Sequence, residues 1–250
     1  MMLQANHITK YFNRGTPSEI LALDHVSLPL AEKEFLVIIG SNGSGKTTLL
    51  NIIAGNYFPD EGTILINGIN VTSKADFERS KWMSRVFQDP LKGTAPDLTI
   101  IDNFRLASLR TRRKGFRIGI NPQFRNFVRG KISVLNLGLE DKLDTLVGKL
   151  SGGQRQALTL LMAAMDEPKI LLLDEPTAAL DPRSAEIVIK LADQLIREQH
   201  LTAILVTHNL RQALDYGSRL MMMDKGKITY DFSDEKKKNL QLREMQEWFV

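Results

Sequence analysis

The sequence predicts an α/β fold built around a mainly parallel sheet. Short apolar runs such as Phe35–Ile39 and Ile170–Leu173 alternate along the chain with longer helical segments. These runs are apolar at every position, which is typical of strands buried on both faces of a parallel sheet. The helical segments that follow them, such as Lys46–Ala54 and Arg183–Gln199, are suited to cross between parallel strands.

Eight apolar runs have the composition of strands, because aliphatic and β-branched residues dominate them. Two connecting sequences, NGIN at residues 67–70 and DKGK at residues 224–227, are typical of hairpin turns. A third predicted helix, Leu210–Tyr216, follows the same alternation. The predicted strands are Leu3–Ile8, Val26–Leu30, Phe35–Ile39, Thr63–Ile66, Arg85–Phe87, Ile170–Leu173, Ala203–Val206 and Leu220–Met223.

Residues 89–165 differ from the rest of the chain. They are polar and basic, carry few strand signals and show helical periodicity in KISVLNLGLEDKLDTLVGKL at residues 131–150. We therefore expect a helical subdomain inserted into an α/β core that consists of residues 1–88 and 166–230. Residues 231–250 are expected to form one polar C-terminal helix.

The composition of the 250 residues excludes several classes of protein. With 43% hydrophobic and 25% charged residues, the chain is neither disordered nor fibrous. The absence of cysteine excludes disulfides, thiolate metal sites and cysteine nucleophiles. No signal-peptide segment is visible, and no apolar run approaches the roughly 18 residues of a membrane span. We therefore expect any role at a membrane to depend on a partner.

The net charge of +4 hides one strongly basic segment. Between Asp102 and Glu140 there are seven arginines, two lysines and no acidic residue. Three interpretations stay open: a solvated face of the helical subdomain, a surface for anionic lipid, and a docking surface for acidic loops of a membrane partner. Nucleic acid is disfavoured because no aromatic stacking series accompanies the charge. Phe116, Phe124 and Phe127 are expected to anchor the segment to the subdomain.

The clearest functional motif is a loop that matches G-x-x-x-x-G-K-[ST] between a predicted strand and a predicted helix. Its glycines let successive backbone N–H groups surround phosphates, and Lys46 can reach the β- and γ-phosphates of a nucleotide. The hydroxyl of Thr47 can ligate Mg²⁺. The residues of this phosphate loop are Gly40, Ser41, Asn42, Gly43, Ser44, Gly45, Lys46, Thr47 and Thr48.

Two adjacent carboxylates, Asp174 and Glu175, follow the predicted strand Ile170–Leu173. Because ligands gather at the carboxyl ends of strands in open α/β sheets, Asp174 suits a water-mediated Mg²⁺ contact and Glu175 suits polarising the attacking water. The alternative is that both residues begin a helix, but Pro176 and the phosphate loop favour the catalytic interpretation. His208 follows another apolar run in the same way, which favours a role at the γ-phosphate.

A second anion-binding feature lies about a hundred residues after the phosphate loop, in the sequence KLSGGQRQALTLL. Ser151 occupies an N-cap position, and Gly152 and Gly153 leave backbone N–H groups uncovered at the start of a helix. Unpaired N–H groups and the positive end of the helix dipole attract an anion there. We therefore predict a second phosphate contact at residues Ser151, Gly152, Gly153 and Gln154.

Together these motifs resemble those of the nucleotide-binding subunits of ABC transporters. LSGGQ matches the family's signature sequence, and the other family motifs follow in the family's order over essentially the whole chain. They are the phosphate loop, VFQDP with Gln88, ILLLDEP, AALD ending at Asp181, and VTH ending at His208. The resemblance implies a P-loop NTPase fold with a RecA-like core, an N-terminal antiparallel β part and an inserted helical subdomain. It also implies ATPase activity with ATP and Mg²⁺.

The resemblance further implies roles for individual residues. Phe12 would stack on the adenine, with Tyr11 as the alternative. Gln88 would sense Mg²⁺ and the attacking water and would link ATP to the helical subdomain. Glu175 would be the general base, and His208 would hold the γ-phosphate.

The expected partners also follow from the resemblance. The signature residues 151–154 would face away from their own phosphate loop and serve the ATP of a second copy in a head-to-tail dimer, with Asp181 at the interface. Integral membrane permease subunits would hold the chain at the cytoplasmic face of the inner membrane. A substrate-binding protein and anionic lipid are further expected partners, whereas nucleic acid is not.

The sequence departs from the family pattern at Met162, where many relatives carry an arginine. The direction of transport stays open, although the separate nucleotide-binding chain favours an importer and FQDPLKGTAPDLTI is similar to importers of amino-acid-like solutes. The alternatives are the ATPase of an exporter, of a lipoprotein-release complex or of a cell-division complex. A nucleic-acid or ribosome-associated ABC ATPase is disfavoured because the chain has one phosphate loop and no cysteine.

Overall fold

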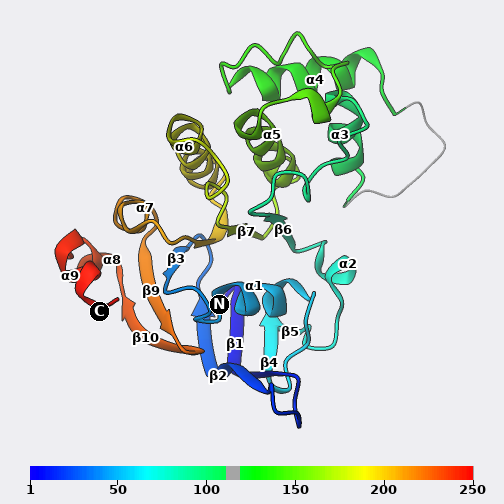
Figure 1. Cartoon of the computed structure of the whole chain (residues 1–250). Coiled ribbons are helices and arrows are strands. Elements are labelled where there is room, and N and C mark those ends of the chain that lie inside the picture. Colours follow the sequence, from blue (N-terminus) through cyan, green and yellow to red (C-terminus); the bar gives the residue numbers. More distant parts are fainter. Residues whose placement is uncertain (111–118, 250) are drawn as a thin grey trace.

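The computed structural model of the chain describes residues 1–110 and 119–249. Within them, ten strands alternate with helices in the predicted way (Figure 1). The strands are β1 (Leu3–Phe12), β2 (Ile20–Leu30), β3 (Phe35–Ile39), β4 (Glu61–Ile66), β5 (Ile69–Asn70), β6 (Met83–Val86), β7 (Ile170–Asp174), β8 (Thr202–Val206), β9 (Arg219–Asp224) and β10 (Lys227–Phe232). The helices are α1 (Lys46–Ala54), α2 (Asp76–Arg79), α3 (Ile100–Ala107), α4 (Pro122–Ser133), α5 (Gly152–Ala164), α6 (Pro182–Glu198), α7 (Leu210–Asp215), α8 (Asp234–Lys237) and α9 (Leu242–Glu247), with one 3₁₀ turn at Val147–Lys149.

The strands form two sheets, which confirms the predicted fold class. The main sheet has the order β10-β9-β3-β8-β7-β6, and its strands from β9 to β6 run parallel. The second sheet, in the order β2-β1-β4-β5, is antiparallel. Both predicted hairpin turns are confirmed, since β4 pairs with β5 and β9 pairs with β10.

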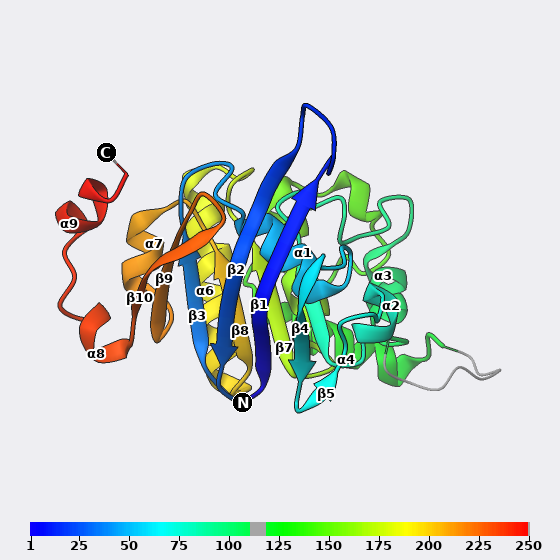
Figure 2. The ribbon, with the colours of Figure 1, turned by 90° about the horizontal axis from the view of Figure 1, so that it is seen from below.

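The continuous apolar strands divide their side chains between two cores. Phe35, Val37 and Ile39 of β3 face the core that holds α3, α5 and α6, whereas Leu36 and Ile38 face the core that holds α1. Successive side chains of a strand point to opposite faces, so a strand covered on both sides must be apolar throughout. Figure 2 shows the antiparallel sheet crossing in front of α1, which lies between the two sheets.

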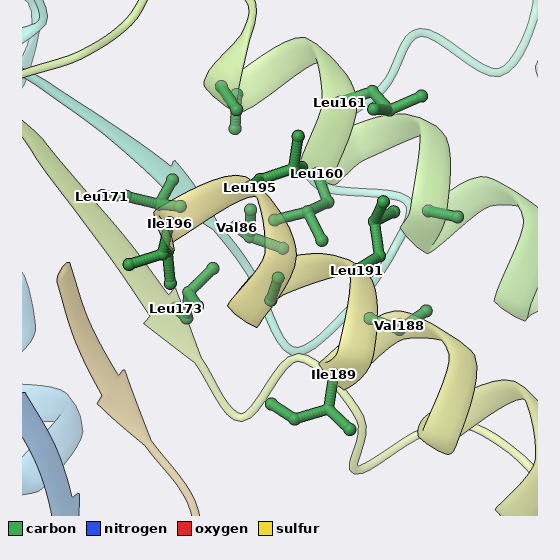
Figure 3. Packing of buried hydrophobic residues seen from close by; sticks show 14 of the residues in the cluster. Val86, Leu160, Leu161, Leu171, Leu173, Val188, Ile189, Leu191, Leu195 and Ile196 are labelled. Atoms are coloured by element: carbon green, nitrogen blue, oxygen red, sulfur yellow. The ribbon is translucent and has the colours of Figure 1, made fainter. Parts of the chain in front are cut away.

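Helices α3, α4 and α5 lie together at one end of the molecule, away from the antiparallel sheet (Figure 1). The long helix α6 packs against α5 and shares a hydrophobic cluster with strands of the main sheet. Figure 3 shows its apolar side chains Leu191 and Leu195 beside Leu160 of α5, within one hydrophobic cluster. Among residues 1–110 and 119–249, no helix has the length and apolar character needed to cross a bilayer.

The helical periodicity at residues 131–150 is misleading, and the prediction of a helix there is wrong. Helix α4 ends at Ser133, and a chain of turns follows as far as the 3₁₀ turn. Asn136 and Gly138 have positive φ angles of 52° and 65°, which an α-helix does not allow. The spaced residues Leu135, Leu139 and Leu143 are nevertheless buried in the core of the helical end, so burial alone produced the pattern.

The prediction of one C-terminal helix is also wrong. Strand β10 continues to Phe232, and the remaining chain forms the two short helices α8 and α9. Trp248, which follows α9, stacks on Tyr230 and Phe232 of β10, at centroid distances of 4.8 and 5.3 Å. Aromatic packing therefore holds the C-terminal segment against the edge strand of the main sheet.

Lys237 fastens this C-terminal segment to helix α7. Its buried Nζ donates hydrogen bonds to the backbone carbonyls of Tyr216 and Gly217, which follow the last turn of α7. Burial lowers the pKa of Lys237 from 10.5 to about 8, and the carboxylates of Asp234 and Asp215 oppose the shift. The folded state therefore binds this proton more weakly than the unfolded state does.

We expect the stabilising effect of Lys237 to grow as pH rises from about 8 towards 10.5. In that window the unfolded state still carries the proton, whereas the neutral amine of the folded state keeps two N–H groups for the two carbonyls. The measurement is the difference in unfolding free energy between the wild type and Lys237→Met in urea at pH 7 and pH 9.5. The exposed neighbour Lys236 supplies the control, Lys236→Met; a difference that shrinks at pH 9.5 contradicts the prediction.

Candidate functional site

The predicted phosphate loop, His208 and the pair Asp174–Glu175 follow three adjacent strands of the main sheet. The loop follows β3, His208 lies two residues beyond β8, and Asp174 ends β7. Because β3, β8 and β7 are parallel neighbours, their carboxyl ends lie along the same edge of the sheet. Residues that are more than a hundred positions apart therefore meet at one site.

Lys46, the first residue of α1, lies at the centre of the phosphate loop. Its Nζ donates hydrogen bonds to the carbonyl oxygens of Gly40 and Ser41, both at 2.8 Å, so the loop curls around the ammonium group. Burial lowers the pKa of Lys46, and the nearby carboxylates of Glu175 and Asp174 oppose that shift. A cation held inside a loop at a helix N-terminus is suited to bind phosphate.

The phosphate loop packs directly on the antiparallel sheet at Gly45. This residue has a φ of 98°, and a Cβ atom there would lie 2.6 Å from the carbonyl oxygen of Ala22 on β2. Only glycine fits this close approach. On β1, Phe12 pairs with Ile20 near the same end of β2 and contacts the ring of Tyr57 edge-on at 5.6 Å. Phe12 is half-buried at the end of β1.

Asp174 connects the phosphate loop to a residue that the sequence analysis missed. Its Oδ1 accepts a hydrogen bond from Thr47 at 3.4 Å, and its Oδ2 accepts one from Arg85 of β6 at 2.5 Å. The next helix, α6, begins only at Pro182, so Asp174 and Glu175 do not form a helix start. The sequence predicts only that Arg85 belongs to a strand. A charged residue next to apolar strand residues nevertheless indicates a buried partner.

Glu175 has a strained backbone at the end of β7. Its φ is 45°, in the left-handed region that residues other than glycine rarely adopt. Its backbone N–H donates to the carbonyl of Val206 on β8, and its Oε2 lies 3.1 Å from Nδ1 of His208. Such strain is typical of functional sites, where the surrounding structure holds one side chain in place.

Gln88 follows β6 and is exposed. The residue before it, Phe87, is connected to the helical end of the molecule through Gln156. The buried Nε2 of Gln156, on α5, donates hydrogen bonds to the carbonyls of Phe87 and Pro176, both at 2.9 Å. These carbonyls belong to the residue before Gln88 and the residue after Glu175. Gln156 therefore ties α5 to both loops. The sequence analysis missed it because its partners lie on other elements.

The signature residues form the N-terminus of α5. Ser151 is the N-cap, and its hydroxyl and the side chain of Gln154 exchange hydrogen bonds with each other's backbone N–H groups. Gly153 packs on α6, where a Cβ atom would lie 2.5 Å from Oγ of Ser184. Asp181 caps α6 by accepting from the N–H of Ser184 at 3.1 Å, and hydrogen bonds from the side chain and the backbone of Ser184 lower the pKa of Asp181. Gly153 is thus needed for helix packing as well.

The structure does not bring the signature residues to the chain's own phosphate loop. Within residues 1–110 and 119–249, no hydrogen bond joins residues 151–154 to residues 40–48. Ser151 and Gly152 are exposed. The helix start that they form is therefore accessible from outside the chain.

The oxygen atoms of Thr47 and Asp174 fit a Mg²⁺ ion that also binds phosphate. The ion prefers oxygen ligands and usually takes only one or two from protein, with the rest from water and substrate phosphates. Among the described residues, no cluster of three or more histidine or acidic side chains could hold a metal ion alone. The oxygens of Thr47 and Asp174 suit a metal ion whose other ligands come from water and phosphate.

Two described arginines of the basic segment, Arg110 and Arg125, are half-buried or paired within the chain. Arg110 is half-buried, and burial lowers its pKa. It lines a groove of about 570 Å³ together with Met162, which is buried where an arginine was expected. Arg125 forms a bidentate ion pair with Asp144, in which Nη1 and Nη2 each donate to one carboxylate oxygen. Phe124 packs on the helical core whereas Phe127 is largely exposed, and Phe116 and the arginines at 112, 113 and 117 lie outside the described residues.

The fold and this site define a P-loop nucleotide-binding protein of the α/β class. The family model for the ABC transporter matches residues 23–178, which is more than half of the chain. The chain therefore belongs to the ABC transporter family, as its ATP-binding and ATP-hydrolysing subunit.

Curated relatives cover nearly the whole chain. A tyrosine transport ATP-binding protein of Clostridioides difficile (strain R20291) is 42% identical over 99% of this chain and 98% of its own length. A protein of Staphylococcus aureus (strain Newman) that is named for hemin import, HrtA, is 34% identical over 92% of this chain and 100% of its own.

Solved structures of ATP-binding cassettes share the fold. A dimeric post-hydrolysis state of the cassette MJ0796, bound to ADP and Pi, superposes with a TM-score of 0.79 at 30% identity and covers 93% of this chain and 99% of its own. The ADP conformation of the cassette MJ1267 has the same TM-score at 27% identity and covers 99% of this chain and 98% of its own.

Proposed function

We propose that this chain is the motor of a bacterial importer for an amino-acid-like solute. One observation carries the proposal: Lys46, Asp174 and Glu175 meet at one edge of the main sheet, where they supply a cation, a metal ligand and a base for phosphoryl transfer from ATP. The relative that is named for hemin import supports import. The relative that is named for tyrosine transport supports an amino-acid-like solute. A substrate-binding protein that delivers the solute belongs to the same proposal.

Each residue of the site has a proposed task. Lys46 and the backbone N–H groups of the phosphate loop bind the phosphates, and Phe12 stacks on the adenine. Thr47, Asp174 and Gln88 would hold Mg²⁺, which would neutralise the charge of the phosphates. Glu175 takes the proton of the attacking water, because its carboxylate is fixed and points to His208.

Two copies are proposed to share two ATP molecules. The exposed helix start at Ser151 and Gly152 offers N–H groups that its own phosphate loop does not use. A head-to-tail dimer would place this start, with Asp181 at the interface, on the γ-phosphate bound by the second copy. The dimeric state of the cassette MJ0796, bound to ADP and Pi, supports the association of two copies.

The domain division is also part of the proposal. Residues 1–88 and 166–230 would bind the nucleotide, residues 89–165 would carry the signature, and residues 231–250 would close the C-terminus. The hydrogen bonds from Gln156 to the carbonyls of Phe87 and Pro176 support a coupled movement of the first two parts.

The groove that Arg110 lines is the proposed contact for the membrane permease. It lies between α2, β6, α3 and α5, directly beside the segment that carries Gln88. Phe77 and Leu106 line it and are 75% and 52% exposed, and exposed apolar side chains of this size mark binding surfaces. Anionic lipid at the basic segment has less support, since Arg110 is half-buried and Arg125 is paired with Asp144.

A photo-crosslinking amino acid at position 77 tests the contact with the permease. Phe77 is expected to crosslink to a membrane protein in cells, whereas the exposed Phe127 of α4, which lies outside the groove, supplies the control position. Equal crosslinking from both positions, or none from position 77, contradicts the proposed contact.

Uptake of radiolabelled tyrosine tests the direction and the solute class. Cells that lack this chain are expected to lose uptake, and the wild type but not Lys46→Ala restores it. Unchanged uptake of all amino acids would reject the importer. Faster loss of a preloaded solute with the wild type would favour an exporter, whereas growth or lipoprotein defects without a transport defect would favour the other complexes.

A further inference from the structure

Arg85 links the metal-binding carboxylate to two strands and a helix. On β6, it is in register with Leu172 of β7, two residues before Asp174. Its Nη2 donates to Oδ2 of Asp174 at 2.5 Å, and both side chains are about nine-tenths buried. Charge-assisted hydrogen bonds from a guanidinium to a carboxylate are among the stronger ones in proteins.

The guanidinium of Arg85 is also held from its other side. Its Nη1 donates to the amide oxygens of Asn51 at 2.6 Å and Asn56 at 3.1 Å, and the group lies 4.8 Å from the centre of the ring of Phe87. The side chain of Asn56 in turn donates to Asp76 at 3.0 Å. These contacts restrain the position of the guanidinium whether or not Asp174 is present.

The restrained guanidinium of Arg85 determines which carboxylate oxygen of Asp174 is available to a metal ion. Oδ2 is engaged by Arg85, so Oδ1 is left to face Thr47, the other proposed ligand of Mg²⁺. A carboxylate with no such partner would rotate and would offer either oxygen. Groups that hydrogen-bond a metal ligand in this way orient it and affect metal affinity.

We propose that Arg85 is a positioning residue that orients Asp174 for Mg²⁺, and that Asn51 fixes Arg85 for this task. The inference rests on the proposed Mg²⁺ site at Thr47 and Asp174. It assigns to β6 a part in metal binding that goes beyond the motif residues of the phosphate loop and of ILLLDEP.

Binding of Mn²⁺ in the presence of ADP tests the proposal without turnover. Free Mn²⁺ is measured by electron paramagnetic resonance for the wild type, Arg85→Lys and Asn51→Ala. We expect Arg85→Lys to weaken Mn²⁺ binding by about 10- to 100-fold, because lysine keeps the charge but cannot bond Asp174 and the amides together. Asn51→Ala is expected to weaken it by a smaller factor. Binding of a fluorescent ATP analogue in EDTA is expected to stay unchanged in both.

Arg219→Lys is the matched control. Arg219 is 16% exposed and bonds Asp231 and Glu34 in a similar network, but on β9 and away from the carboxyl ends of β3 and β7. Its variant should bind Mn²⁺ as the wild type does. Unchanged Mn²⁺ affinity in folded Arg85→Lys, or in Asn51→Ala, overturns the proposal. If Arg85→Lys does not fold, Asn51→Ala decides alone. Failure of the wild type to bind Mn²⁺ with ADP would instead refute the metal site itself.

Discussion

Glu175→Gln is expected to lower the rate of ATP hydrolysis by about 100- to 10,000-fold, the usual contribution of a general base. Glutamine keeps the shape of the side chain and can still bond His208, which lies 3.1 Å from Oε2, but it cannot take a proton from water. The phosphate loop and Lys46 are untouched, so ATP binding should persist. Because ATP is then held without turnover, the two-copy state should accumulate.

The measurements are phosphate release, binding of labelled ATP, and size-exclusion chromatography with and without ATP. Glu186→Gln is the matched control, since Glu186 is exposed on α6 and pairs with Lys190 on the same helix. It should hydrolyse ATP at the wild-type rate. Wild-type turnover by Glu175→Gln would mean that another group accepts the proton. Lost turnover without an ATP-dependent dimer would separate the catalytic role of Glu175 from the proposed dimerisation.

Arg79→Met is expected to cost at least about 3 kcal/mol of unfolding free energy. The fully buried guanidinium donates from Nη1 to the carbonyls of Ile52 and Ile53, at 2.7 and 2.8 Å, in the last turn of α1. It also donates to the carbonyls of Thr72 and Lys74. Burial lowers its pKa to about 10, so it stays charged at neutral pH. Methionine would fill the volume but would leave buried carbonyls unpaired, at about 1–3 kcal/mol each.

Urea unfolding followed by circular dichroism measures this loss. Arg243→Met is the control, because Arg243 is 89% exposed on α9 and its removal should change the unfolding free energy by less than about 0.5 kcal/mol. Since Arg79 joins α2 to the end of α1, whose first residues are proposed to bind phosphate, we also expect weaker ATP binding in Arg79→Met. Equal stability of the two variants would show that water can replace the guanidinium.

The sequence predicted the elements of the phosphate loop to the residue. Phe35–Ile39 and Lys46–Ala54 are the observed bounds of β3 and α1, because a fully apolar strand, a glycine loop and a helix have strong local preferences. The same reasoning failed at residues 131–150, where Leu135, Leu139 and Leu143 repeat with a helical period but are buried from turns. Periodicity reports which residues are buried, and burial does not require a helix.

Local sequence patterns suffice to predict the phosphate loop and the pair Asp174–Glu175, since each consists of residues that are close along the chain, and the alternation of apolar runs with helical segments indicates the fold class. The side chains that meet these residues depend on tertiary packing. Arg85 reaches Asp174 across 89 positions, and Gln156 reaches the carbonyl of Phe87 across 69. These contacts depend on the order β8-β7-β6 and on the packing of α5 over it. Strand order is set by how the apolar faces of distant segments fit together, which no local pattern of residues encodes.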